Sequence, residues 1–206
     1  MENDLSPLLT RIAEALERLA PPPAASATFE GARLFRRDTA SGAFLPAPDY
    51  GLPLDLLVGV DRQKARFGQN LERFATGLPF NHALLWGVRG TGKSSMAKAA
   101  FMAAAKTHAR LKMIEIDRDE VSHLPALFDL LRGRDEAFLV LCDDLSFEDG
   151  AQAAKDLKSA LEGGVAGPPA NVMFVATSNR RHLMPRDHEE SRGAIAAQED
   201  AEEEVS

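Results

Sequence analysis

The chain has a single cysteine and no long apolar run. With Cys142 alone among 206 residues, an internal disulfide is excluded, and its apolar surroundings predict core packing. The five histidines lack metal-ligand spacing, so we do not expect a zinc site. No apolar stretch approaches the ~20 residues of a membrane helix. The acidic N-terminus lacks the layout of a secretion signal. These absences predict a cytoplasmic protein without a membrane partner.

Positive charge is also in the minority, since the formal net charge is −7. This balance argues against broad nucleic-acid affinity. Acidic residues are concentrated in residues 187–206. We predict that this segment is a solvated, disordered tail, because the apolar periodicity ends after Pro185. Four cations near this tail are open to two interpretations, a surface patch or a nucleic-acid contact. They are Arg180, Arg181, Arg186 and Arg192.

A glycine-rich segment supplies the most specific motif. Residues 87–94 read GVRGTGKS and satisfy the phosphate-loop pattern G-x-x-x-x-G-K-[ST]. An apolar run precedes the motif and a helix-forming run follows it, so backbone N–H groups and a helix N-terminus would surround the phosphates. Lys93 would reach the β and γ phosphates, and the Ser94 hydroxyl would serve Mg²⁺. The predicted nucleotide-binding residues here are Gly87, Val88, Arg89, Gly90, Thr91, Gly92, Lys93, Ser94 and Ser95.

Polar residues follow two later apolar strands. Asp143 and Asp144 come after residues 138–142, where Asp143 would hold the Mg²⁺ shell and Asp144 would orient or deprotonate the attacking water. The alternative for this pair is a polar turn. Asn179 follows residues 172–177 and could hold the lytic water, or cap the strand as a turn residue. We predict Lys93, Asp144 and Asn179 as the catalytic set.

Strand-like and helix-like segments alternate from residue 52 onward. This pattern predicts an α/β fold with a parallel sheet covered on both faces and ligands at the carboxyl ends of the strands. The predicted strands are residues 82–86, 111–116, 137–142 and 172–177, and the predicted helices are residues 62–75, 94–107, 124–132 and 152–162. Trp86 ends the first of these strands and is predicted to lie in the core.

The chain divides into four predicted parts. Residues 1–23 form an amphipathic helix with an apolar stripe from Leu5 to Leu19, which packs on its own domain or binds a partner. Residues 24–51 are a small accessory segment or linker, with a hairpin of residues 33–36 and 43–45. Residues 52–186 are the large nucleotide-binding subdomain, and residues 187–206 are the acidic tail.

Together the motifs resemble those of the AAA+ P-loop ATPases. The resemblance covers roughly residues 52–185. It is greater to a bacterial family of predicted AAA+ ATP-binding proteins, and the segments that carry this second resemblance are residues 85–95, 142–148 and 176–183. It implies a three-layer α/β/α fold with a mostly parallel sheet, and ATP and Mg²⁺ as cofactors. This resemblance implies that Lys93 and Ser94 belong to the Walker A motif and that Asp143 and Asp144 form the Walker B motif. It also implies that Asn179 is the sensor-1 residue. Val58 and Gly59 belong to the segment that covers the adenine.

The sequence departs from the AAA+ pattern in two ways. The family usually has Asp-Glu at Walker B, whereas the second acid here is Asp144. One methylene less shifts the carboxylate enough to slow a reaction with a positioned water. After sensor 1 the family continues with an arginine finger, a fifth strand and a helical lid, and no such pattern follows Asn179. We therefore expect a large subdomain without its lid, as in a piece of a longer protein.

Three functions remain open at this point. The first is an ATP-binding AAA+ domain with weak Mg²⁺-dependent hydrolysis, an ATPase that assembles into a homo-oligomeric ring in the full-length protein. The second is a nucleotide-switched module that binds DNA, a helicase or another protein client. The third is a GTPase or small-molecule kinase. We rank it last because the chain has no Asn-Lys-x-Asp guanine reader and nothing between Asp143 and Asn179 suggests an acceptor pocket.

Overall fold

The computed structural model describes residues 28–38, 41–145, 157–161 and 167–179. The predicted N-terminal helix, the four cations after Asn179 and the acidic tail lie outside these ranges, as does most of the predicted helix 152–162, of which residues 157–161 are helical. Within the described ranges, no helix has both the length and the apolar character that crossing a membrane requires.

A six-stranded sheet forms the centre of the fold, with the order β2-β1-β4-β5-β6-β3. Only the pair β1–β2 is antiparallel, and the other neighbours are parallel. The predicted mostly parallel sheet is confirmed. The strands are β1 (Leu34–Arg37), β2 (Phe44–Ala47), β3 (Ala83–Trp86), β4 (Leu111–Ile116), β5 (Ala137–Cys142) and β6 (Val172–Ser178).

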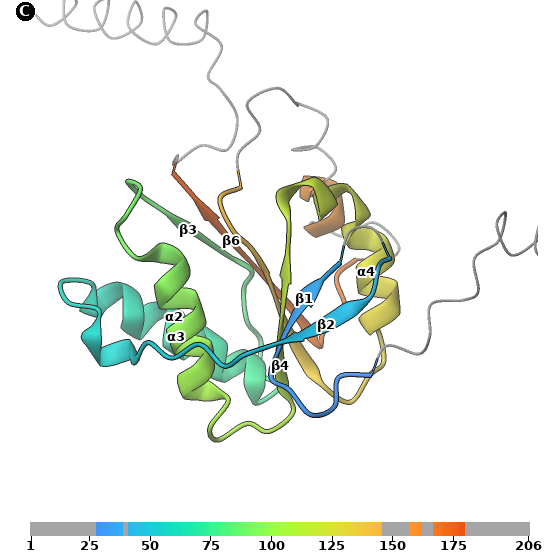
Figure 1. Ribbon diagram of the computed structural model, residues 1–206, viewed down its shortest axis with the longest axis horizontal. Coiled ribbons are helices and arrows are strands. Elements are labelled where there is room, and N and C mark those ends of the chain that lie inside the picture. The colour runs from blue at the N-terminus through green and yellow to red at the C-terminus, as the bar shows by residue number, and fades with distance from the viewer. Residues whose placement is uncertain (1–27, 39–40, 146–156, 162–166, 180–206) are drawn as a thin grey trace, which may run out of the picture.

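Helices cover both faces of the sheet, as expected for a three-layer α/β/α fold. Helices α2 (Asp61–Ala75) and α3 (Lys93–Ala104) lie together on one side, and α4 (Leu124–Leu131) lies on the other (Figure 1). The described ranges also contain two short 3₁₀ helices, η1 (Leu54–Leu56) and η2 (Arg118–His123). Each face has its own buried apolar cluster. Within the described ranges, every α-helix packs on the sheet and none forms a separate lid.

The helix next to the phosphate loop packs closely because its buried residues are small. Ala97 and Ala100 of α3 are buried against the sheet, and Phe101 is fully buried. Helix α2 covers α3 with Phe67, Leu71 and Phe74, spaced by four and three residues on one helical face. Burying side chains of this size stabilises a fold by about 1.5–3 kcal/mol each. This packing holds the N-terminus of α3 in place relative to the sheet.

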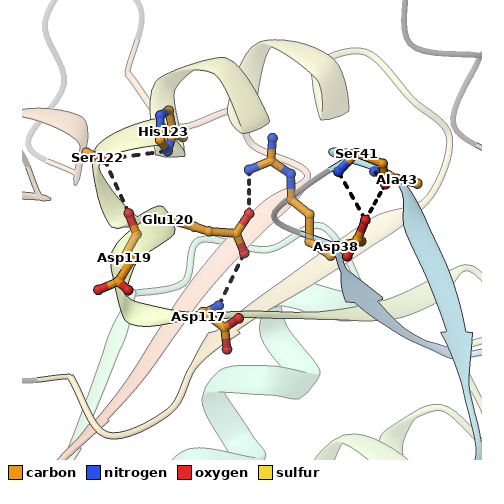
Figure 2. Close-up of polar contacts among 9 residues, drawn as sticks. Asp38, Ser41, Ala43, Asp117, Asp119, Glu120, Ser122 and His123 are labelled. Carbon is orange, nitrogen blue, oxygen red and sulfur yellow. Dashed lines mark hydrogen bonds and ion pairs between the residues drawn. The ribbon is translucent and has the colours of Figure 1, made fainter.

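The predicted hairpin is present and belongs to the main sheet. Strand β1 pairs antiparallel with β2 over Leu34–Arg37 and parallel with β4 on its other side. A partly buried ion pair connects this region to η2, because Arg37 Nη1 donates to Glu120 Oε1 at 2.9 Å. The other carboxylate oxygen of Glu120 accepts a bond from the Asp117 N–H (Figure 2). The described part of residues 24–51 thus extends the sheet of the subdomain that follows.

Two predictions about individual core residues have different outcomes. Cys142 is fully buried, and burial raises the pKa of its thiol to about 12, so it is a protonated core residue as predicted. Trp86 was expected in the core, but 53% of its surface is exposed. Among the described strands β3 pairs only with β6, so it is an edge strand. Its residues Ala83 and Leu85 pack on the core, whereas Leu84 and Trp86 face away from it.

Candidate functional site

The glycine-rich segment connects β3 to α3 at the carboxyl edge of the sheet. The Gly87 N–H donates to the Ser178 carbonyl at 3.2 Å, which joins the start of the loop to the end of β6. Gly90 and Gly92 have φ values of 81° and 80°, in the left-handed region that favours glycine. Gly92 is the N-cap of α3, and no side chain in the described part of the chain caps that helix. The N–H groups of its first turn are therefore available to an anion.

Lys93 lies over this loop and uses all three of its hydrogen-bond donors. Its Nζ donates to the carbonyls of Gly87 at 2.9 Å and Val88 at 3.0 Å. The third bond goes to Asn179 Oδ1 at 3.1 Å, at the end of β6. The present acceptors of the Lys93 ammonium group are neutral, whereas the oxygens of a bound phosphate carry negative charge. Hydrogen bonds to ionised acceptors are stronger, so a phosphate that enters the loop would bind Lys93 more strongly than these groups do.

Asp143 follows β5 and accepts bonds from two neighbouring elements. Ser94 Oγ, from the first turn of α3, donates to Asp143 Oδ1 at 2.5 Å, and Thr177 Oγ1, from β6, donates to the same oxygen at 2.5 Å. Burial acts to raise the pKa of this carboxyl. The bonds from Ser94 and Thr177 and the charge of Lys98 outweigh burial and hold the pKa below its ordinary value. Asp143 is therefore ionised at neutral pH.

Asp144 is the exposed member of the acidic pair. Its φ is 52°, the only positive value among the described residues other than glycine. Asn179 Nδ2 donates to Asp144 Oδ1 at 2.7 Å, while Asn179 Oδ1 accepts from Lys93. The amide of Asn179 thus joins the three predicted catalytic residues in one chain of hydrogen bonds.

These groups surround a cavity of about 340 Å³. It is lined by Arg89, Gly90, Gly92, Lys93, Ser94, Ser95, Asp143, Asp144, Thr177 and Asn179. Gly87, Val88 and Thr91 were predicted to bind nucleotide but do not line the cavity. They shape the loop instead, as in the bond from Thr91 Oγ1 to the Val88 carbonyl at 2.8 Å.

The predicted adenine segment lies next to the loop but outside this cavity. Leu57 Cδ2 is 3.6 Å from the position that a Cβ would take on Gly92. Lys64 Nζ holds the segment by a bond to the Leu57 carbonyl at 2.7 Å. Val58 is 88% exposed and Gly59 has a φ of 78°, and neither lines the cavity. The predicted adenine segment therefore lies beside the phosphate loop without contributing to this cavity.

A larger groove, of about 650 Å³, lies elsewhere, between η1, α2 and α3. Its lining is largely apolar and includes Leu54, Met102 and Ala103, together with Lys64 and Lys106. No predicted site residue lines it. Of these two cavities among the described residues, the smaller is the candidate site, because it brings together acids, a lysine, hydroxyls and an amide.

Sequence reasoning missed two residues of the site. Thr177 is 1% exposed and bonded to Asp143, and a threonine at the end of an otherwise apolar strand was the available signal. Lys98 Nζ forms an ion pair with Glu115 Oε1 at 2.8 Å and lies near Asp143. Lys98 follows Ser94 by four residues, so the two side chains lie on one face of a helix. This spacing was the feature of the sequence that could have indicated Lys98.

The residues present fit a magnesium triphosphate. Ser94 and Asp143 offer hydroxyl and carboxylate oxygens, the ligand type that Mg²⁺ prefers. The open first turn of α3 and Lys93 offer N–H donors and positive charge to phosphates. The strand–loop–helix unit, the acids after the buried strand β5 and the mostly parallel sheet define the fold of an AAA+-type P-loop domain. The chain belongs to the family described as "Protein of unknown function (DUF815)", whose model matches residues 30–206.

Several solved structures are similar to this chain. The RuvB Holliday junction branch migration motor of Thermotoga maritima is 19% identical with a TM-score of 0.45, over 67% of this chain and 43% of RuvB. Trip13 in the HORMA:CdnC:Trip13 complex of E. coli MS115-1 is 15% identical with a TM-score of 0.47, over 64% of this chain and 57% of that one. ORC1 of Aeropyrum pernix, in complex with DNA, is 18% identical with a TM-score of 0.44, over 65% of this chain and 41% of ORC1.

The chain thus spans less than two thirds of each of these structures. Identity and TM-score are both low, so no property of these proteins is transferred to this chain. No curated protein matches it.

Proposed function

We propose that this chain binds ATP with Mg²⁺ at the cavity between the phosphate loop and the Asp143-Asp144 pair, and that it hydrolyses ATP slowly. The observation that carries the proposal is the 2.5 Å bond between Ser94 Oγ and Asp143 Oδ1. These residues are 49 positions apart, yet the fold brings together the hydroxyl and the carboxylate that a phosphate-bound Mg²⁺ requires.

Each residue of the site has a distinct role in this proposal. The first-turn N–H groups of α3 bind the phosphates, and Lys93 exchanges its bonds to the loop carbonyls and Asn179 for phosphate oxygens. Ser94 and Asp143 would hold Mg²⁺, which supplies charge neutralisation on the phosphates. Asn179 orients the attacking water, and Asp144 accepts its proton. We also propose that Val58 and Gly59 approach the base.

Slow turnover follows from the composition of the cavity. Lys93 and Arg89 are the only cations that line it among the described residues. An arginine finger, where measured, contributes about 10³–10⁵ in rate. We propose that a second copy of the chain, assembled in a ring, supplies such a cation.

The test is a calorimetric titration with ATP, in Mg²⁺ and in EDTA. In Lys93→Ala we expect binding to be lost, because hydrogen bonds to charged groups contribute about 1.5–3 kcal/mol each. Lys106→Ala is the matched control, since Lys106 is an exposed lysine just beyond the end of the same helix and outside the cavity. It should bind ATP as the wild type does. Unchanged ATP affinity in Lys93→Ala would refute the site.

A second candidate function is a nucleotide-switched binding module for DNA, a helicase or another protein. The contact that favours it is the bond from Lys93 to Asn179, because a phosphate that draws Lys93 away removes a constraint at the end of β6. Steady-state phosphate release with and without DNA, at low and high salt, separates the two functions. Salt-sensitive stimulation by DNA is the outcome that supports the module.

A further inference from the structure

Thr177 holds the segment that carries both acids of the site. Its Oγ1 donates to Asp143 Oδ1 at 2.5 Å and accepts from the Asp144 N–H at 3.0 Å. Its carbonyl accepts from the Leu145 N–H at 2.7 Å. One residue of β6 therefore binds three consecutive residues after β5.

The chemistry of a hydroxyl fixes the direction of these bonds. An ionised carboxylate only accepts, so the single hydroxyl hydrogen goes to Asp143, and an oxygen lone pair receives the Asp144 N–H. The side chain is 1% exposed, so water does not take over these contacts if the hydroxyl is removed. An apolar residue of the same shape would lose both bonds together.

The contacts determine how each acid is presented to the cavity. Asp143 Oδ1 accepts from Ser94, Thr177 and the Asp144 N–H, whereas no described residue donates to Oδ2. Thr177 therefore helps select the oxygen that remains for a further ligand. For Asp144, the bonded N–H fixes the backbone at a positive φ, from which the carboxylate reaches Asn179.

We propose that Thr177 is a positioning residue for the magnesium-bound state, which orients Asp143 through its hydroxyl and Asp144 through its backbone. This inference rests on the proposed function, since it concerns the same site. Groups that orient a metal ligand without touching the metal typically contribute about 10- to 100-fold in metal affinity.

The experiment compares Thr177→Val with Thr177→Ser. Valine keeps the branched shape without the hydroxyl, and serine keeps the hydroxyl. The probe is Mn²⁺ in place of Mg²⁺, titrated into the protein–ATP complex and followed by electron paramagnetic resonance, alongside ATP affinity in EDTA. For Thr177→Val we expect Mn²⁺ affinity to fall about 10- to 100-fold, with ATP affinity in EDTA within about twofold of wild type. Thr177→Ser should restore most of the Mn²⁺ affinity.

A control separates positioning from loss of stability. Val172→Ala removes buried volume at the other end of β6, far from the acids, and should leave Mn²⁺ affinity unchanged. If the Thr177→Val variant does not fold, the Thr177→Ala variant takes its place and is compared with Thr177→Ser in the same measurements.

The inference is overturned if the variants without the hydroxyl bind Mn²⁺ as wild type does, or if Val172→Ala loses as much affinity. The proposed function fails separately, if the wild type does not bind ATP or if Lys93→Ala binds it equally well.

Discussion

Lys93 Nζ lies 3.1 Å from Asn179 Oδ1, although the two residues are 86 positions apart in the sequence. The contact joins the phosphate loop to the end of β6, and the same amide donates to Asp144 at 2.7 Å. A ligand that attracts Lys93 therefore also changes the surroundings of the carboxylate that we place next to the attacking water. Under the proposed function, the Asn179 side chain would couple ATP binding to hydrolysis, which leads to the first prediction.

Asp144→Asn should separate binding from hydrolysis. The amide keeps the shape of the side chain but neither carries a charge nor accepts a proton, so residual hydrolysis should fall about 100-fold or more, while ATP affinity stays within a few-fold. The measurements are phosphate release and ATP titration on the same samples. Asp119→Asn, at an acid whose side chain is 88% exposed on η2, is the control and should leave both unchanged. Wild-type hydrolysis by Asp144→Asn would contradict the role of Asp144.

The backbone at Asp144 predicts a cost for the AAA+-typical glutamate. The φ of 52° is in the left-handed region, which Asp and Asn adopt more readily than longer side chains because they bond locally to the backbone. Asp144→Glu should lower the free energy of unfolding by about 1 kcal/mol, and Asp144→Asn should not. Urea denaturation compares the three proteins. Equal stability of Asp144→Glu and the wild type would mean that the backbone does not select the shorter acid.

His82 should make stability depend on pH. Burial lowers the pKa of His82 from its ordinary 6.5, and its Nδ1 accepts a bond from the Phe174 N–H at 3.1 Å. The unfolded chain therefore binds a proton more readily than the folded one, so stability is present above pH 6.5 and is lost as the pH falls below it.

The variant His82→Asn offers an oxygen acceptor that does not titrate. Urea denaturation at about pH 7.5 and about pH 5.5 should show a smaller loss on acidification in this variant than in the wild type. His123→Asn, at an exposed histidine, controls for the removal of an imidazole. The same loss in His82→Asn as in the wild type would exclude His82 as the source.

Removing one partner of the partly buried pair Arg37–Glu120 should lower the free energy of unfolding more than replacing both partners with apolar residues. Glu120 is 5% exposed, and Arg37 Nε is buried without a hydrogen-bond partner among the described residues. Arg37→Met leaves the Glu120 carboxylate unpaired and should cost roughly 2–3 kcal/mol of unfolding free energy. Arg37→Met with Glu120→Leu should recover part of that loss, as measured in a double-mutant cycle by urea denaturation. A double variant less stable than Arg37→Met alone would contradict this account.

Much of the fold could be predicted because its signals are local. The strands Leu111–Ile116 and Ala137–Cys142 are observed at their predicted ends, since continuous apolar runs of that length are typical of buried parallel strands. The error at Trp86 has a tertiary cause. An apolar run does not reveal whether a strand lies in the middle of a sheet or at its edge, and β3 lies at the edge of the described sheet.

The sequence by itself determined the phosphate-loop motif, because the glycines, the lysine and the serine that define it lie within residues 87–94. It also placed Asp143 at the end of a strand. Only the tertiary structure decided which groups meet there. Strand β6, the last described in the chain, lies between β5 and β3, so Thr177 contacts Asp143 and Asn179 contacts Lys93. Strand order results from how the faces of the whole sheet pack, and no local pattern of residues specifies it.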